Sequence, residues 1–127
     1  MTLQPGLSGS SQATVTHADT ARALGSGDLE VLGTPRLVAL LEHAAVVALD
    51  GELDEGTTSV GVAVDIEHLA PTPVGGTVRA VATLMDIEGH TLHFTVQALD
   101  DRGEVARGEH RRALVDRQRF LRRAAGG

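Results

Sequence analysis

A glutamate inside an apolar helix is the feature of this chain that most directly suggests chemistry. Glu42 lies in the stretch 34–50, whose spacing of apolar residues predicts one helix. Its neighbours at helical spacing are all apolar: Val38, Ala45, Val46 and Leu49. Because an isolated buried charge costs on the order of several kcal/mol, a carboxylate there needs a partner or a raised pKa. Glu42 is therefore a candidate functional group, and the alternative is an edge residue whose carboxylate reaches water.

His68 is the second residue whose position suggests chemistry. Residues 58–69 alternate with a period of two, which predicts a half-buried strand. His68 is in phase with the apolar residues of that strand, namely Val60, Val62, Val64 and Ile66. A histidine that enters the core face opposite a helix carrying Glu42 could form an acid–base pair with it. The alternative, which His68 taken alone favours, is a structural histidine bonded to a backbone carbonyl.

Arg112 is a third candidate, on a strand expected at 104–115. An inward side chain is predicted by its phase with three residues of low polarity: Ala106, Gly108 and Leu114. Arg111 is adjacent, so one of the two arginines must face solvent, and the alternative is that Arg112 does. An inward Arg112 would require an anion, which could be Glu42, another carboxylate or a bound phosphate.

The elements that position these residues are a helix followed by strands. Thr34 is a suitable N-cap, and Pro35 suits the first position of a helix over 35–49. Period-two patterns between turn residues predict four strands, after a shorter strand and a helical turn. The expected ranges are 13–17 for the short strand, 19–24 for the helical turn, and 58–69, 77–87, 90–99 and 104–115 for the four strands.

This order of elements predicts an α+β fold in which an antiparallel sheet wraps around a long central helix. A second copy of the chain would cover the apolar helix surface that the sheet leaves exposed, so we expect a homodimer. The 127 residues are expected to form one domain, 12–120. It would lie between a disordered Gly/Ser/Pro-rich N-terminal tail, 1–11, and a C-terminal tail, 121–127.

Composition excludes several classes of protein. The net charge of −6 argues against a general nucleic-acid-binding protein, and no apolar stretch approaches the ~18 residues of a membrane span. The absence of cysteine excludes a thiol nucleophile and a cysteine-based metal site. Without a recognisable signal peptide, a cytoplasmic location is expected. All 11 basic residues are arginine, which together with the Ala, Val and Gly content favours a GC-rich bacterial source.

Five segments in a fixed order carry a resemblance to a known family. They are 31–35 (VLGTP), 40–44 (LLEHA), 59–61 (SVG), 66–75 (IEHLAPTPVG) and 108–112 (GEHRR). Their order and spacing over residues 12–120 resemble the hot-dog-fold thioesterases of the fluoroacetyl-CoA thioesterase type. The active-site threonine, glutamate and histidine of that family fall on Thr34, Glu42 and His68. Its glycine near the thioester falls on Gly61, and its active-site arginine falls on Arg112.

The resemblance implies hydrolysis of an acyl-CoA thioester by a homodimer with sites at the subunit interface. Coenzyme A is then part of the substrate, and neither a cofactor nor a metal is expected. The fluoroacetyl-specific enzyme has a lid of phenylalanines before the threonine, whereas residues 23–30 contain none. A short-chain acyl-CoA is therefore expected, and its acyl group stays open.

The roles that follow are those of a thioester hydrolase. Thr34 would be the nucleophile or a positioning hydroxyl, Glu42 and His68 would handle protons and water, and the Gly61 N–H would stabilise the oxyanion. Eight helical residues span about 12 Å, so Thr34 and Glu42 of one continuous helix cannot touch. Either the helix starts later than expected, or the site combines two subunits. The alternative function is a non-catalytic dimer that binds acyl-CoA or a small ligand; a hydratase is disfavoured, because no Asp–His pair has the spacing of hot-dog hydratases.

Overall fold

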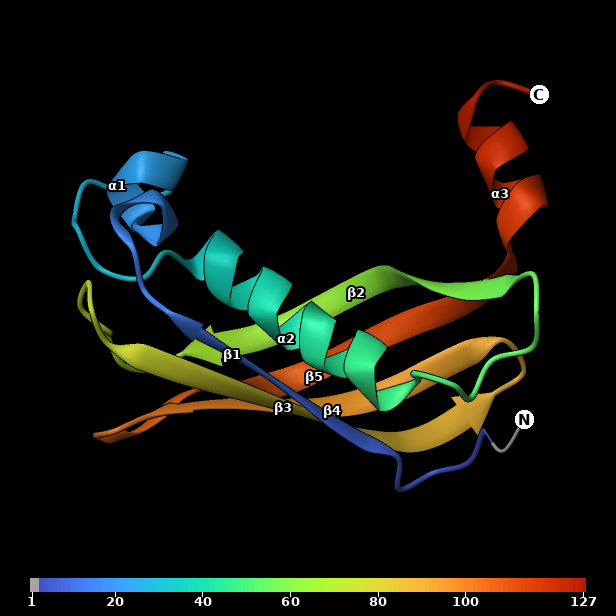
Figure 1. Ribbon diagram of the computed structural model, residues 1–127, viewed down its shortest axis with the longest axis horizontal. Helices are drawn as coiled ribbons and strands as arrows, with labels where there is room; N and C mark the ends of the chain where they lie inside the picture. The colour runs from blue at the N-terminus through green and yellow to red at the C-terminus, as the bar shows by residue number, and fades with distance from the viewer. Residues whose placement is uncertain (1–2) are drawn as a thin grey trace.

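The computed structural model describes residues 3–127, which form one antiparallel sheet with the helices on one side of it (Figure 1). The strands are β1 (Ser8–Thr14), β2 (Thr57–His68), β3 (Thr77–Glu88), β4 (Thr91–Asp100) and β5 (Gly103–Asp116). The helices are a short 3₁₀ turn (His17–Asp19), α1 (Ala21–Leu24), α2 (Thr34–Ala48) and α3 (Arg117–Ala124). The expected α+β fold, a long helix wrapped by an antiparallel sheet, is confirmed.

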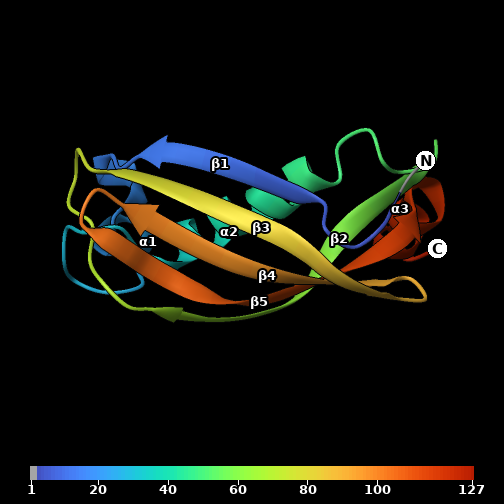
Figure 2. The ribbon, with the colours of Figure 1, turned by 90° about the horizontal axis from the view of Figure 1, so that it is seen from below.

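The strands of the sheet lie in the order β1-β3-β4-β5-β2, so β1 and β2 are the two edges. Helix α2 crosses one face of the sheet, while the opposite face, seen in Figure 2, carries none of the described helices. Helices α1 and α3 lie near opposite ends of the molecule (Figure 1). One edge of β2 therefore forms no backbone hydrogen bonds with another strand among residues 3–127.

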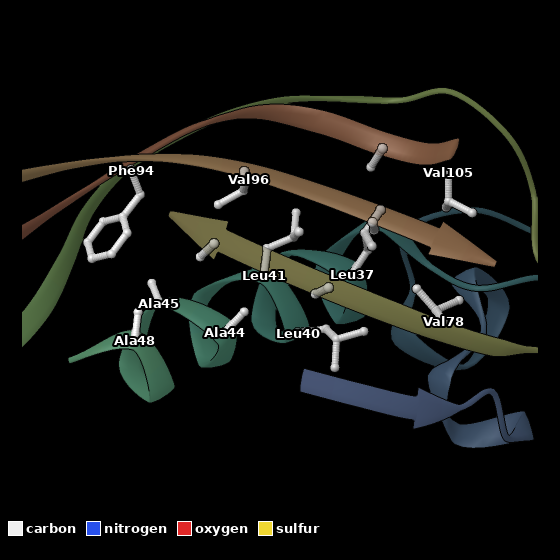
Figure 3. Close-up of a cluster of buried hydrophobic side chains, with 14 of the residues drawn as sticks. Leu37, Leu40, Leu41, Ala44, Ala45, Ala48, Val78, Phe94, Val96 and Val105 are labelled. Carbon is white, nitrogen blue, oxygen red and sulfur yellow. The ribbon is translucent and has the colours of Figure 1, made fainter. Parts of the chain in front are cut away.

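The core lies between α2 and the sheet (Figure 3). The expected alternation of β4 is confirmed, because every second side chain is almost completely buried: Leu92, Phe94, Val96 and Ala98. Helix α2 contributes leucines and, towards its end, small residues that let the sheet approach: Leu37, Leu40, Leu41, Ala44, Ala45 and Ala48. Phe94 is the single aromatic side chain buried here, so the core depends on close packing of aliphatic groups.

Strand β1 contradicts the expected disorder of the first residues. Residues 8–11, assigned to the disordered tail 1–11, pair with β3, and the expected strand at 13–17 instead ends at Thr14. A Cβ at Gly9 would collide with the backbone of Ala44 and Ala48. The Gly/Ser content therefore reflects the close approach of β1 to α2 and not a lack of structure. Residues 1–2 lie outside the described part of the chain.

The start of α2 also differs from the expectation. Gly33 is the N-cap, and Thr34 is the first helical residue, so Thr34 does not cap the helix. The hydroxyl of Thr34 is consequently available for a tertiary contact. Because the helix includes both residues, Thr34 and Glu42 lie about 12 Å apart along its axis. A later helix start is therefore excluded as a way to bring them together.

The expected alternation of β2 holds only in part. A bulge between Gly61 and Ala63 shifts the register against β5. Val62 is 53% exposed and Val64 is 38% exposed, although both were expected on the core face. The bulge, together with the edge position of β2, explains the difference, because α2 packs mainly on β1 and β3. An uncovered apolar row remains on β2.

Replacing Gly9 tests the packing of β1 on α2. We expect Gly9→Ala to lower the free energy of unfolding by about 1–3 kcal/mol, because the added methyl group meets helix backbone that cannot rotate away. Urea denaturation measures the change, and Ser10→Ala, at an exposed position of the same strand, is the control. A midpoint equal to that of the unaltered protein would mean that β1 does not lie against α2 in this way.

Candidate active site

Arg112 is the centre of a buried polar cluster on β5. Its side chain is 7% exposed, and its Nη1 donates a hydrogen bond to Oε2 of Glu42 at 3.2 Å. Its Nε donates to Oγ of Ser59 at 2.8 Å, and its Nη2 donates to the Ser59 carbonyl at 3.2 Å. Burial lowers the pKa of Arg112, and the Glu42 carboxylate opposes this effect. Of the anions that the sequence allowed, the structure pairs Arg112 with Glu42.

The Glu42 carboxylate lies directly against the backbone of Gly61. A Cβ at Gly61 would collide with Oε2 of Glu42 and would come within 3.4 Å of Nη1 of Arg112. A side chain at position 61 would therefore displace the Glu42 carboxylate from this position against Arg112. The Glu42 side chain is 37% exposed, which is intermediate between the buried group and the edge residue considered from the sequence. One side of the carboxylate contacts Arg112, and the group as a whole reaches the surface.

His110 belongs to this cluster and was not given a role from the sequence. The Ala63 carbonyl, which can only accept, lies 2.8 Å from Nδ1 of His110, and Nη1 of Arg112, which can only donate, lies 3.1 Å from Nε2. These two contacts require a neutral His110 with its proton on Nδ1. Burial lowers the pKa of His110, and the Arg112 charge adds to the effect. The available signal was the phase of His110 with Arg112, two residues away on one face of β5.

Thr34 and His68 form a second polar group at the end of β2. Oγ1 of Thr34 and Nδ1 of His68 are 2.8 Å apart. Nε2 of His68 is buried and has no hydrogen-bond partner among residues 3–127. Burial lowers the pKa of His68, so its ring is neutral at pH 7 and can accept a proton. A hydroxyl bonded to a neutral imidazole is an arrangement that can generate a nucleophile.

The five predicted site residues thus form two separate groups within one chain. Glu42, Gly61 and Arg112 are in contact, as are Thr34 and His68. Seven residues of strand separate Gly61 from His68, a span of about 20 Å. A direct acid–base pair between Glu42 and His68 does not form inside a single chain. Within one chain the two groups are therefore not in contact.

Two further features concern metals and membranes. Within residues 3–127, no three His, Asp or Glu side chains are arranged to hold a metal ion. None of the helices in this part of the chain is long and apolar enough to cross a membrane.

Solved structures of thioesterases resemble this chain over almost its whole length. A structure of the fluoroacetyl-CoA thioesterase FlK has a TM-score of 0.91 and 30% sequence identity, covering 99% of this chain and 98% of that one. A thioesterase superfamily member from Thermus thermophilus has a TM-score of 0.88 and 25% identity, covering 98% of this chain and 95% of that one. The wrapped helix and these matches define a hot-dog-fold protein of the thioesterase class.

The family is narrower than that class. A family model described as fluoroacetyl-CoA-specific thioesterase matches residues 15–118, and the chain belongs to this family. A curated relative from Streptantibioticus cattleyicolor, named fluoroacetyl-CoA thioesterase, is 38% identical over 91 residues. The match covers 72% of this chain and 66% of the relative, just under two thirds of the relative's length.

Two substitutions of His110 separate its two hydrogen bonds. Glutamine places an amide oxygen where Nε2 accepts from Arg112, whereas asparagine reproduces only the donor towards Ala63. We expect His110→Asn to cost about 1–3 kcal/mol of unfolding free energy at pH 8, because Arg112 loses a buried acceptor, and His110→Gln to cost less. Urea denaturation measures both, and equal losses in the two variants would show that acceptance from Arg112 is unimportant.

The same variants test the protonation state. A pKa of His110 held below its ordinary value of 6.5 means that the unfolded chain binds the proton first as the pH falls. Stability contributed by neutral His110 is therefore present above pH 6.5 and is lost as the pH falls below 6.5 through the lowered pKa of the folded state. His110→Gln should flatten this decline, with His17→Gln, at an exposed histidine, as the control.

Proposed function

We propose that this protein hydrolyses a short-chain acyl-CoA thioester at sites formed between two copies of the chain. The observation that carries the proposal is the Thr34–His68 pair, a hydroxyl 2.8 Å from a neutral imidazole whose other nitrogen is buried and unpartnered. A hydrogen-bonding group from outside the described chain would satisfy that nitrogen. The relatives agree in chemistry, since structures of FlK were determined with acetyl-CoA and with fluoroacetate and CoA.

The edge strand β2 supports a dimeric arrangement. Its valines Val62 and Val64 are exposed, as are two valines of α2, Val46 and Val47. Antiparallel pairing of two β2 edges would cover these side chains and satisfy the free side of the strand. A two-fold axis near Val64 would place His68 of one copy opposite Val60 of the other. His68 would then lie beside the second copy's cluster around Arg112.

In the proposed reaction, Thr34 and His68 act as a hydroxyl and its base. His68 accepts the proton of Thr34, or of a water that Thr34 positions, as the oxygen bonds to the thioester carbonyl carbon. His68 then returns the proton to the coenzyme A sulfur as the carbon–sulfur bond breaks. If Thr34 is the nucleophile, water hydrolyses the ester and restores the hydroxyl. Both routes give a free carboxylic acid and the thiol of coenzyme A, without a metal or a further cofactor.

The cluster of the second copy would supply the remaining groups. Both contacts of Glu42 to the cluster use Oε2, so its Oε1 is the oxygen that would accept a hydrogen bond from Nε2–H of the incoming His68. That bond would fix the His68 tautomer and stabilise the imidazolium that forms. The Gly61 N–H and the Arg112 guanidinium would be the donors to the thioester oxygen as it gains charge. Arg112 is held in place by Ser59 and His110.

Replacing Glu42 tests this assignment. Glu42→Gln keeps volume and polarity and removes the charge, so we expect turnover to fall by roughly 10² or more. The free energy of unfolding should fall by up to about 3–5 kcal/mol, because the buried Arg112 guanidinium loses its counter-charge although the amide oxygen still accepts from it. A thiol-release assay over a panel of acyl-CoAs measures the rate, with His68→Ala as the inactive reference and Glu55→Gln, on an exposed loop, as the matched control. Undiminished hydrolysis in Glu42→Gln would remove this glutamate from the mechanism.

The dimer is tested by a charge on the β2 edge. The protein should sediment at twice the chain mass of 13.2 kDa at micromolar concentration. Val62→Glu should give a folded monomer without hydrolytic activity, because each new carboxylate would be desolvated in the interface, opposite Ile66 of the other copy. Met85→Glu makes the same change at another exposed apolar residue and should leave the dimer intact. A fully active monomer would contradict the interface site.

A further inference from the structure

Helix α3 contributes almost nothing to the core. None of its residues, Arg117–Ala124, is buried, and its contacts with the rest of the chain are mainly with β5. In Figure 1 it projects from the sheet at the end opposite α1. Four of its eight residues are arginines, and none is acidic. In a chain with a net charge of −6, this is a local concentration of positive charge that folding does not require.

A cavity of about 520 Å³ lies between α3, the end of β5 and the adjoining loops. From α3 it is lined by Phe120, which is 37% exposed, and by Arg119 and Arg123. His90 and Leu114 form part of the opposite wall. An aromatic ring and two guanidinium groups that line one cavity suit a planar base attached to phosphates, because the ring stacks and the arginines bind anions.

Two carboxylates also line this cavity, and they indicate where a phosphate group would not bind. Asp116 caps α3 by accepting a hydrogen bond from the Arg119 backbone N–H at 2.9 Å. Asp54 lies in the loop before β2. Phosphate groups would therefore lie against Arg119 and Arg123, away from Asp54 in the loop and from Asp116 at the start of α3.

A smaller crevice of about 220 Å³ connects this region to the cluster around Arg112. It runs between the end of α2 and β2, and it is lined by Leu49, Ser59 and, at its outer end, Arg117. Thr57 lines both the crevice and the larger cavity, so the two adjoin. At its inner end, Ser59 is the residue that binds Arg112. Four residues at the end of β5 lie between Arg112 and Arg117, the first residue of α3, so the two arginines are about 17 Å apart.

We propose that α3 and its cavity bind the 3′-phosphorylated ADP moiety of coenzyme A, with the pantetheine arm lying in the crevice. This inference rests on the proposed acyl-CoA substrate and names where its nucleotide binds. The adenine stacks on Phe120, and Arg119 and Arg123 bind the phosphates, of which the 3′-phosphate carries about −1.5 to −2 charge at pH 7. The crevice leads the thioester from there to Ser59 and Arg112.

The test compares ligands with and without the nucleotide. Arg119→Ala/Arg123→Ala should raise the KM for acetyl-CoA, or for another acyl-CoA that the protein hydrolyses, by about 10- to 100-fold while leaving kcat unchanged, because two charge-assisted contacts are lost. The same acyl group on pantetheine should be hydrolysed with an unchanged KM. The control Arg79→Ala/Arg102→Ala removes two exposed arginines elsewhere. Melting temperatures should match the unaltered protein, since α3 carries no buried residue.

Calorimetry keeps this inference separate from the proposed reaction. The unaltered protein should bind coenzyme A more tightly than dephospho-coenzyme A, and the Arg119/Arg123 variant should lose that preference. A protein that hydrolyses no acyl-CoA but shows this preference would refute the reaction and support the nucleotide site. Hydrolysis with an unchanged KM in the variant, an equal loss for acyl-pantetheine, or no binding of coenzyme A would overturn the nucleotide site.

Discussion

The buried guanidinium of Arg112 constrains the rest of the candidate site. A charge that is 7% exposed is tolerated only with an anion and with acceptors for its remaining donors. Glu42 supplies the anion, Ser59 supplies two acceptors, and His110 supplies a ring nitrogen. Each contact then constrains something else: a side chain at position 61 would displace the Glu42 carboxylate, and a hydrogen bond accepted from Arg112 requires neutral His110. One buried charge therefore constrains a residue on β2 and the tautomer of a residue on β5.

The geometry of β2 explains why the two polar groups stay apart in one chain. Gly61 and His68 lie on the same strand, and a strand cannot fold back on itself within seven residues. Thr34 and Glu42 are likewise held apart by one continuous helix. The Thr34–His68 group therefore lies at one end and the Glu42–Gly61 group further along the molecule, and no local movement brings the two groups together. In the proposed dimer, two β2 strands pair in opposite directions, which would place the His68 group of one copy beside the Glu42 group of the other.

The sequence was informative wherever a single periodicity governed the chain. The pattern of β4 predicted which side chains are buried, and the phase of Arg112 predicted both its inward direction and Glu42 as a possible partner. The sequence was misleading where one residue type is compatible with two structures. Gly9 was assigned to disorder, although glycine there permits backbone contact between β1 and α2. The bulge after Gly61 could not be seen, because an inserted residue changes the phase without changing the residue types.

The burial of His68 links assembly to chemistry in the proposed dimer. A buried nitrogen without a partner costs about 1–3 kcal/mol, and within residues 3–127 Nε2 of His68 has none. A second copy that offers a carboxylate would relieve this cost, so forming the site would itself stabilise the dimer. The same contact would make His68 a stronger base, because a carboxylate beside an imidazole stabilises its protonated form. The basicity of His68, whose Nε2 lacks a hydrogen-bond partner in the single chain, would thus depend on formation of the dimer.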